Sequence, residues 1–116
     1  MSSSDPKCIF CKIVEGKIPS KKVYEDAELL AFHDIHPWAP VHVLVIPKAH
    51  VATLSETGPQ HEALLGRMLA LAPKLMAQLG VTNGYRVVVN TGPDGGQEVY
   101  HLHMHVMGGP RPWVKG

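Results

Sequence analysis

Three histidines alternate with apolar residues in the run HLHMHVM, residues 101–107. Successive side chains of a β-strand point to opposite faces, so His101, His103 and His105 should share one face, about 6.6 Å from one to the next. The apolar residues between them would then pack into a core on the other face. Clustered imidazoles can ligate a metal or attack as nucleophiles. The run therefore predicts a strand that carries the chemistry of the protein.

The central histidine of this run, His103, is the predicted nucleophile. It has an imidazole on either side, and these neighbours can orient it, contact phosphate oxygens or discourage its protonation. A neutral imidazole is a useful nucleophile when its second nitrogen is held by a hydrogen bond. Attack on phosphorus would give a phosphohistidine intermediate and divide one difficult displacement into two easier ones.

Polar groups elsewhere in the sequence could bind a nucleotide. The glycine-bearing residues 92–97 come shortly before the triad, and their glycines let a phosphate approach backbone N–H groups. Asn90 and Gln97 could contact a phosphate or a ribose, or could stabilise the turn. Asp34 follows an apolar segment, where a carboxylate could accept both ribose hydroxyls or cap a turn.

A second group of candidate residues begins with Cys8 and Cys11 near the N-terminus. A C-x-x-C pair could be a redox couple, half of a zinc site or two small buried apolar residues. A thioredoxin-like couple usually follows a strand, and nothing strand-like precedes Cys8. Zinc needs two further ligands, for which His50 and His101 are candidates, but spacing alone leaves the three interpretations open.

Length and composition set bounds on the scaffold. The 116 residues, 45% of them hydrophobic, suit one domain with one core. A net charge of +1 argues against nucleic acid or an acidic membrane as a main partner. No signal region or membrane-spanning run is visible. The two cysteines are too close for a disulfide framework, so we expect a cytoplasmic protein with reduced thiols.

The spacing of apolar residues predicts an α+β fold with an antiparallel sheet of about five strands, one short N-terminal helix and one long helix. The first helix is expected to begin at Asp5 and Pro6, run for about ten residues and end at Gly16. The long helix is expected over residues 60–79. The predicted strands cover residues 22–25, 29–34, 42–47, 85–90 and 98–107.

The triad run resembles the signature of the histidine triad (HIT) superfamily of nucleotide hydrolases and transferases. The likeness extends over almost the whole chain, from CIFCKIVEGKIPSKKVYED through FHDIHPWAPVHVLVIPKAH to GGQEVYHLHMHVMGG. Residues 95–109 and Trp113 resemble the branch of histidine triad nucleotide-binding proteins, which are purine nucleoside phosphoramidases. This resemblance implies a single HIT domain over residues 1–116, with residues 1–5 flexible and residues 110–116 as a C-terminal tail.

The resemblance implies catalytic roles for four histidines. His103 corresponds to the nucleophile that attacks the α-phosphate, and His105 to a histidine that contacts the phosphate. His101 would orient His103, partly through its main-chain carbonyl, and His42 would assist from the neighbouring strand.

The resemblance also implies a site for a purine nucleotide and no organic cofactor. Asp34 matches the carboxylate that binds the ribose. The purine pocket would be formed by Ile9, Phe10, Ile13, Phe32, His33, Ile35 and Leu44. The phosphate side would be formed by Asn90, Gly96, Gln97 and Val99.

Zinc and a second subunit are further implications. Some members of the superfamily bind structural zinc, and Cys8, Cys11, His50 and His101 match all four ligand types. Family members are homodimers in which the long helix and a central strand pair across the two-fold axis. Trp113 would then reach the active site of the partner.

One departure from the branch concerns the substrate. Glu98 stands where the branch often has serine, and its carboxylate would tolerate a cationic amine leaving group but repel a second phosphate. His36 and Trp38 also replace smaller or more polar residues in the loop after Asp34.

The favoured hypothesis is hydrolysis of the P–N bond of purine nucleoside 5′-phosphoramidates or aminoacyl adenylates through a nucleotidyl-His103 intermediate. A dinucleoside polyphosphate hydrolase or nucleotidyl transferase is the alternative within the superfamily. A non-catalytic module that binds a nucleotide or zinc is the alternative of a different class.

Overall fold

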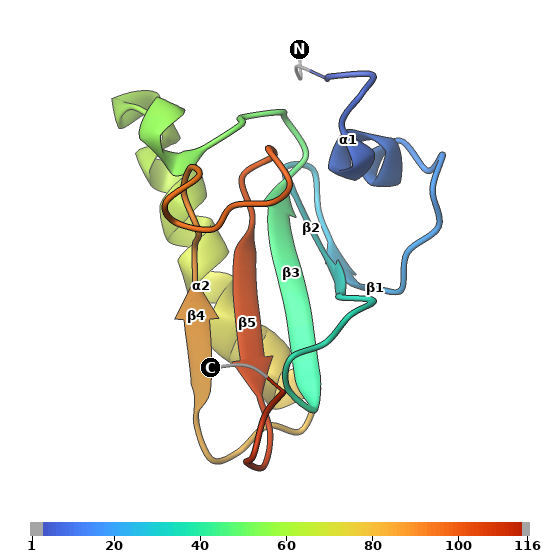
Figure 1. The fold of residues 1–116 in the computed structure, drawn as a ribbon, viewed down its shortest axis with the longest axis vertical. Coiled ribbons are helices and arrows are strands. Elements are labelled where there is room, and N and C mark those ends of the chain that lie inside the picture. Colours follow the sequence, from blue (N-terminus) through green and yellow to red (C-terminus); the bar gives the residue numbers. More distant parts are fainter. Residues whose placement is uncertain (1–3, 115–116) are drawn as a thin grey trace.

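A five-stranded antiparallel sheet forms the centre of the molecule, with the strands in the order β1-β2-β3-β5-β4 (Figure 1). The structure is a computed structural model, and it describes residues 4–114. The strands are β1 (Lys22–Glu25), β2 (Leu29–His33), β3 (Val41–Pro47), β4 (Tyr85–Val88) and β5 (Met104–Gly108). The helices are α1 (Ile9–Val14) and α2 (Glu62–Gln78), with 3-10 turns η1 (Leu54–Glu56) and η2 (Pro59–His61). The predicted α+β fold with one short and one long helix is confirmed.

The long helix α2 covers one face of the sheet and forms the main core with it (Figure 1). The apolar residues that alternate with the three histidines all belong to this core, because extended backbone sends them to the face opposite the imidazoles. The core combines strand and helix residues, namely Leu29, Ala31, Val43, Val45, Met68, Leu71, Ala72, Leu75, Met76, Leu102, Met104 and Val106.

The short helix α1 lies on the other side of the sheet, near the end of β3 and the start of β5 (Figure 1). It contributes to a second apolar cluster together with alternate residues of β2 and β3. That cluster comprises Cys8, Phe10, Cys11, Ile13, Leu30, Phe32, Leu44 and Ile46. Strand β3 is buried on both faces along almost its whole length, as expected for an apolar strand at the centre of a sheet.

The prediction of a strand over residues 98–107 is wrong at its start, because β5 begins only at Met104. Ahead of it, the backbone bonds to a loop instead of a neighbouring strand, with Leu102 N–H donating to the Val51 carbonyl at 2.7 Å. The His101 carbonyl accepts a hydrogen bond from the His103 side chain. Only His105 of the three histidines therefore lies within the regular strand.

The first helix is also shorter than predicted, and Cys8 replaces Asp5 as its N-cap. The Asp5 carboxylate accepts the Lys7 N–H at 2.9 Å, and its carbonyl accepts the Cys8 N–H at 3.0 Å. These bonds close a separate turn ahead of α1, so the helix starts only at Ile9. Its predicted end is confirmed, since Gly16 has a φ of +78°, which suits glycine at a helix C-terminus.

The other predicted boundaries differ by one to three residues. Residues 59–61 form the turn η2, so α2 starts after them; β3 gains Val41, and β4 ends at Val88. Strand β2 ends at His33, because the Asp34 carboxylate turns the chain by accepting the His36 N–H at 2.8 Å.

Two further predictions concern the chain ends and membranes. Part of the predicted flexible segment and part of the predicted tail, residues 1–3 and 115–116, lie outside the described residues. Within residues 4–114, no helix combines the length and the hydropathy needed to cross a membrane.

Candidate active site

A cavity of about 310 Å³ opens between α1, the end of β2, the middle of β3, and the histidines on either side of the start of β5. It brings together most of the residues predicted to bind a nucleotide: Ile9, Phe10, Ile13, Phe32, His33, Asp34, Ile35, Leu44, Asn90, Gly96, Glu98, Val99, His103 and His105. Sequence reasoning did not assign five further lining residues to the site: Ile18, Pro19, Ser20, His36 and Trp38.

His103 lies in this cavity with one ring nitrogen fixed by the backbone. Its Nδ1–H donates to the His101 carbonyl at 2.7 Å, so the lone pair of the neutral ring is on Nε2. The Phe10 ring packs edge-on against it, with centroids 5.2 Å apart. Burial lowers the pKa of His103 below its ordinary value, although the bond to the His101 carbonyl opposes this shift. The ring is therefore neutral at neutral pH.

His42 and His105 form a directed pair beside it. The Trp38 backbone N–H donates to His42 Nδ1 at 3.0 Å, which makes that nitrogen an acceptor and leaves the His42 hydrogen on Nε2. His42 Nε2–H then donates to His105 Nδ1 at 2.9 Å, so the hydrogen of neutral His105 is on its Nε2. Backbone geometry thus sets the tautomers of both imidazoles.

The pKa values of this pair are also lowered. Burial lowers the pKa of His105 to about 4, with smaller contributions from His103 and His42. Burial lowers the pKa of His42 as well, while the Asp34 carboxylate opposes the shift. One Asp34 oxygen lies 3.5 Å from His42 Nε2, and the carboxylate lines the cavity. A carboxylate in this position can accept hydroxyl hydrogens from a ligand.

Trp38 covers the histidine pair on the side of the loop between β2 and β3. Its ring is nearly parallel to that of His105, at an interplanar angle of 13° and a centroid distance of 5.4 Å. It also contacts His42 in a tilted arrangement. The sequence does show a large aromatic residue, Trp38, in a loop between two prolines. It does not show which rings Trp38 contacts, because these contacts depend on how the loop folds back.

The opposite end of the cavity is mostly apolar. Phe10 and Phe32 meet edge to face, with centroids 5.6 Å apart, beside Ile9 and Ile13. Ser20 is the exception, because its Oγ is buried and has no hydrogen-bond partner within residues 4–114. A flat apolar ligand group with polar edges would fill this space and could satisfy that hydroxyl.

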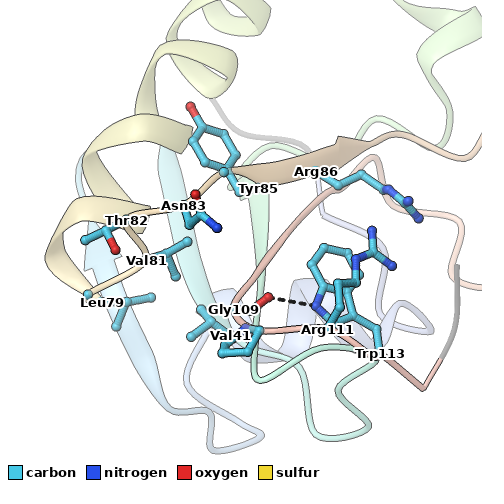
Figure 2. Close-up of a pocket in the computed structure, with 13 residues that line it drawn as sticks. Val41, Leu79, Val81, Thr82, Asn83, Tyr85, Arg86, Gly109, Arg111 and Trp113 are labelled. Carbon is cyan, nitrogen blue, oxygen red and sulfur yellow. Dashed lines mark hydrogen bonds between the residues drawn. The ribbon is translucent and has the colours of Figure 1, made fainter.

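Two residues predicted to bind a nucleotide lie elsewhere. Gln97 supports the neighbouring loops, since its side chain accepts the Gly92 N–H and donates to the Ala52 and Val99 carbonyls. Trp113 lines a separate pocket of about 700 Å³ (Figure 2). Its Nε1–H donates to the Gly109 carbonyl at 3.0 Å, and the Arg111 guanidinium lies 3.6 Å from its ring centre (Figure 2).

The four residues proposed as metal ligands do converge. Their ligand atoms are all within 4.8 Å of one another. Cys8 Sγ and His101 Nδ1 are 3.3 Å apart, as are Cys11 Sγ and His50 Nδ1; Cys11 Sγ and His101 Nδ1 are 3.6 Å apart. A tetrahedron with zinc bonds of about 2.0–2.3 Å has edges of about 3.3–3.8 Å, so these spacings fit tetrahedral zinc.

The donor atoms also have the right chemistry for zinc. His101 Nε2–H donates to the Pro47 carbonyl at 2.7 Å, so the free lone pair of the neutral ring is on Nδ1 and faces the cluster. The sulfurs of Cys8 and Cys11 accept the backbone N–H groups of Cys11 and Asp5, at 3.3 and 3.4 Å. Burial raises the pKa of the Cys8 thiol, and the bond from the Cys11 N–H opposes that shift by stabilising the thiolate, the form in which cysteine binds metal.

Asp34, His42 and His105 also converge, but they differ from the cysteine cluster. The His42 and His105 nitrogens are only 2.9 Å apart, which is a hydrogen-bond distance and shorter than a tetrahedral edge. This group therefore has the geometry of a hydrogen-bonded relay, whereas the cysteine cluster has the geometry of a metal site. His101 joins the two, because its ring faces the sulfurs while its carbonyl holds His103.

Comparison with known proteins gives consistent matches. A HIT domain family model matches residues 15–111. The chain is 48% identical over 102 residues to the purine nucleoside phosphoramidase of Escherichia coli K12, covering 87% of this chain and 86% of that protein. A HIT family hydrolase from Legionella pneumophila is 47% identical with a TM-score of 0.87, and the match covers 90% of this chain and 95% of that one.

A Zn-bound histidine triad family protein from Mycobacterium smegmatis is 34% identical to this chain, with a TM-score of 0.78. The match covers 88% of this chain and 74% of that one.

Proposed function

This chain belongs to the HIT domain family, and we propose that it hydrolyses the P–N bond of purine nucleoside 5′-phosphoramidates. The proposal treats residues 1–116 as one HIT domain. The observation that carries it is the neutral His103 ring, whose free Nε2 lone pair faces a cavity that also contains the Nε2–H of His105. The name of the Escherichia coli relative, at 48% identity, supports the choice of substrate class.

In the proposed first step, the His103 Nε2 lone pair attacks the α-phosphorus and the P–N bond breaks. The leaving nitrogen takes a proton from His105 Nε2 and departs as a neutral amine. His105 must be protonated for this transfer, and the negative charge of a bound phosphate raises the pKa of a neighbouring imidazole. The added proton occupies His105 Nδ1, so the His42 Nε2–H turns from His105 to the Asp34 carboxylate, 3.5 Å from it. The enzyme then carries a nucleotidyl group on His103, whose positive charge is stabilised by the His101 carbonyl.

In the proposed second step, water attacks the phosphorus of nucleotidyl-His103. The bond from phosphorus to Nε2 breaks, and its electron pair returns to the imidazole of His103. Neutral His105 accepts the proton of the attacking water, which restores the state of the first step. The product is a nucleoside 5′-monophosphate.

The cavity supports a purine nucleotide as the bound group. The edge-to-face pair of Phe10 and Phe32 offers an apolar slot for a planar base, and the Ser20 hydroxyl offers a hydrogen bond to its edge. Asp34 lines the same cavity, where its carboxylate would accept ribose hydroxyls.

We also propose that Cys8, Cys11, His50 and His101 hold one structural zinc ion. Bound zinc would link α1 to the segment after β3 and to the backbone that supports His103. The spacing of the four ligand atoms and the Zn-bound relative support this assignment. Reduced cysteine ligands suit the cytoplasm, the location predicted from the sequence.

We further propose that the protein is a homodimer. Within residues 4–114, strand β4 lies at the edge of the sheet with β5 as its one neighbour, and Leu69 on α2 is 58% exposed. Both features would be covered by a second copy. A dimer would also let Trp113, which lies outside its own nucleotide cavity, approach that of the partner. Gel filtration with light scattering tests this, and a monomer would contradict it.

The function is tested by steady-state turnover of adenosine 5′-phosphoramidate and of a dinucleoside polyphosphate by the same preparation. We expect the higher kcat/KM for the phosphoramidate. Faster turnover of the polyphosphate would assign the protein to that class of hydrolase. Tight binding of AMP with no turnover of either compound would indicate a non-catalytic module.

A further inference from the structure

A second, open cavity of about 480 Å³ adjoins the nucleotide cavity. It is lined by Trp38, Asn90, Gly95, Gly96, Gln97 and Glu98. Trp38, Asn90, Gly96 and Glu98 line both cavities, so the two spaces meet at these residues. A ligand bound across this boundary would have one part in each cavity.

The lining of the second cavity favours a positive charge. Glu98 is the one charged residue among its lining residues, and its side chain is exposed to solvent. Trp38 contributes the face or edge of an indole, the aromatic group that attracts cations most strongly. A second phosphate here would meet a carboxylate and no positive side chain of the lining.

The second cavity also lies on the side from which the leaving group would depart. Trp38 stacks on His105, the residue proposed to give a proton to the leaving nitrogen. In a phosphoryl transfer the attacking and leaving atoms are roughly in line across phosphorus. With His103 as the attacking group, a leaving nitrogen that meets His105 would carry its substituent toward Trp38.

We propose that this second cavity is the leaving-group subsite and that Glu98 and Trp38 select amines carrying an additional positive charge. The inference rests on the proposed phosphoramidase function and specifies its substrates. Adenosine phosphoramidates of diamines, or of amino acid derivatives with a cationic side chain, belong to this class. Glu98 supplies the charge, and Trp38 supplies the surface along which the leaving group lies.

The test compares two adenosine 5′-phosphoramidates of similar length, one made from 1,4-diaminobutane and the other from pentylamine. We expect wild type to have the higher kcat/KM for the cationic compound, and Glu98→Gln to lower the ratio of the two values by about 2- to 5-fold. High salt should reduce the wild-type ratio, because it screens an exposed carboxylate. Glu56→Gln, a change of the same kind in η1, is the control and should keep the wild-type ratio.

Trp38 is tested by Trp38→Phe and Trp38→Leu. The phenyl ring should retain most of the preference for the cationic amine, whereas leucine should reduce it to the part that Glu98 supplies, since leucine has the bulk but no π face. An unchanged ratio in Glu98→Gln, in an enzyme that still turns over both compounds, would overturn the subsite and leave the phosphoramidase function intact. No turnover of either compound by wild type would instead overturn the function itself.

Discussion

The two faces of the sheet are built in different ways. On the α2 face, the buried residues are apolar side chains packed between helix and strands. On the α1 face, apolar residues share the space with two cysteines, several imidazoles and a cavity of about 310 Å³. A buried polar group is costly unless it has a hydrogen-bond partner. One face of the sheet therefore stabilises the fold, and the other holds the buried polar groups of the candidate site.

On the α1 face, each of three buried imidazoles donates a hydrogen bond to a specific acceptor. His101 donates to the Pro47 carbonyl, His103 to the His101 carbonyl, and His42 to His105. Each bond also decides which ring nitrogen keeps its lone pair. The bonds that satisfy the buried imidazoles are thus the same bonds that prepare them for chemistry or for metal binding.

The largest expected effect is on activity and comes from the α1 face. His103→Ala should lower kcat/KM for adenosine phosphoramidate by at least about 10³-fold, because the proposed nucleophile is lost. The free energy of unfolding should change by less than about 1 kcal/mol, since the site already borders a cavity. Turnover and urea unfolding of the same preparation measure both quantities. A variant with wild-type turnover would contradict the proposed function.

On the α2 face a substitution should cost stability and leave the activity almost unchanged. Leu75 is 1% exposed in the core, so Leu75→Ala should destabilise the protein by about 3 kcal/mol. At a temperature where the variant is folded, kcat/KM should stay within about threefold of wild type. Lys74→Ala, at the exposed neighbouring position of α2, is the matched control and should cost less than about 0.5 kcal/mol. An equal decrease in the free energy of unfolding in Leu75→Ala and Lys74→Ala would show that packing on this face does not stabilise the fold.

Zinc should stabilise the α1 face in a concentration-dependent way. At free zinc 100 times Kd, the folded chain should gain about 2.7 kcal/mol, and a chelator should reverse the gain. Elemental analysis of protein purified without a histidine tag should give about one zinc per chain. Cys11→Ser should abolish the thermal shift on adding zinc. The same shift in wild type and Cys11→Ser would exclude the cysteine cluster as its cause.

The smallest expected effect concerns the contact of α2 with the turn between β1 and β2. Burial raises the pKa of Asp26, but hydrogen bonds from Tyr24 and two backbone N–H groups, together with Arg67, outweigh it and lower the pKa to about 2. A carboxyl with a lowered pKa stabilises the fold above its unfolded value of 3.8, and this contribution is lost as the pH falls toward 2.

Asp26→Asn should therefore cost about 1–2 kcal/mol at pH 7, allowing for screening by solvent, and almost nothing at pH 2. Urea unfolding across this pH range measures the difference from wild type. Asp94→Asn, a change of the same kind in the exposed loop before the triad, is the matched control. A difference that persists unchanged at pH 2 would rule out the charge of Asp26 as its source.

The sequence predicted the faces of the sheet better than the extent of its strands. Leu102 and His103 point to opposite faces as predicted, because alternation requires only extended backbone. The start of β5 could not be predicted, because it depends on Leu102 bonding to Val51, some fifty positions earlier in the chain. The start of α1 was missed because Asp5 caps a turn of its own.

Some residues of the candidate site could likewise be predicted from the sequence, and others could not. Residues within or close to a recognisable motif, such as His105 and Glu98, could be assigned to the cavity in advance. The meeting of Cys8, His50 and His101 is a property of the tertiary structure, and sequence spacing could only make it a candidate. Trp38 was missed as a site residue because its stacking on His105 depends on the path of a loop.

The central claim, a covalent intermediate on His103, is tested most directly by the stereochemistry of the reaction at phosphorus. The substrate is an adenosine phosphoramidate made chiral at phosphorus with sulfur, hydrolysed in water enriched in ¹⁸O. Two successive in-line displacements, one by His103 and one by water, predict retention of configuration in the product. Inversion would mean that water attacks the substrate directly, and it would contradict the nucleophilic role of His103.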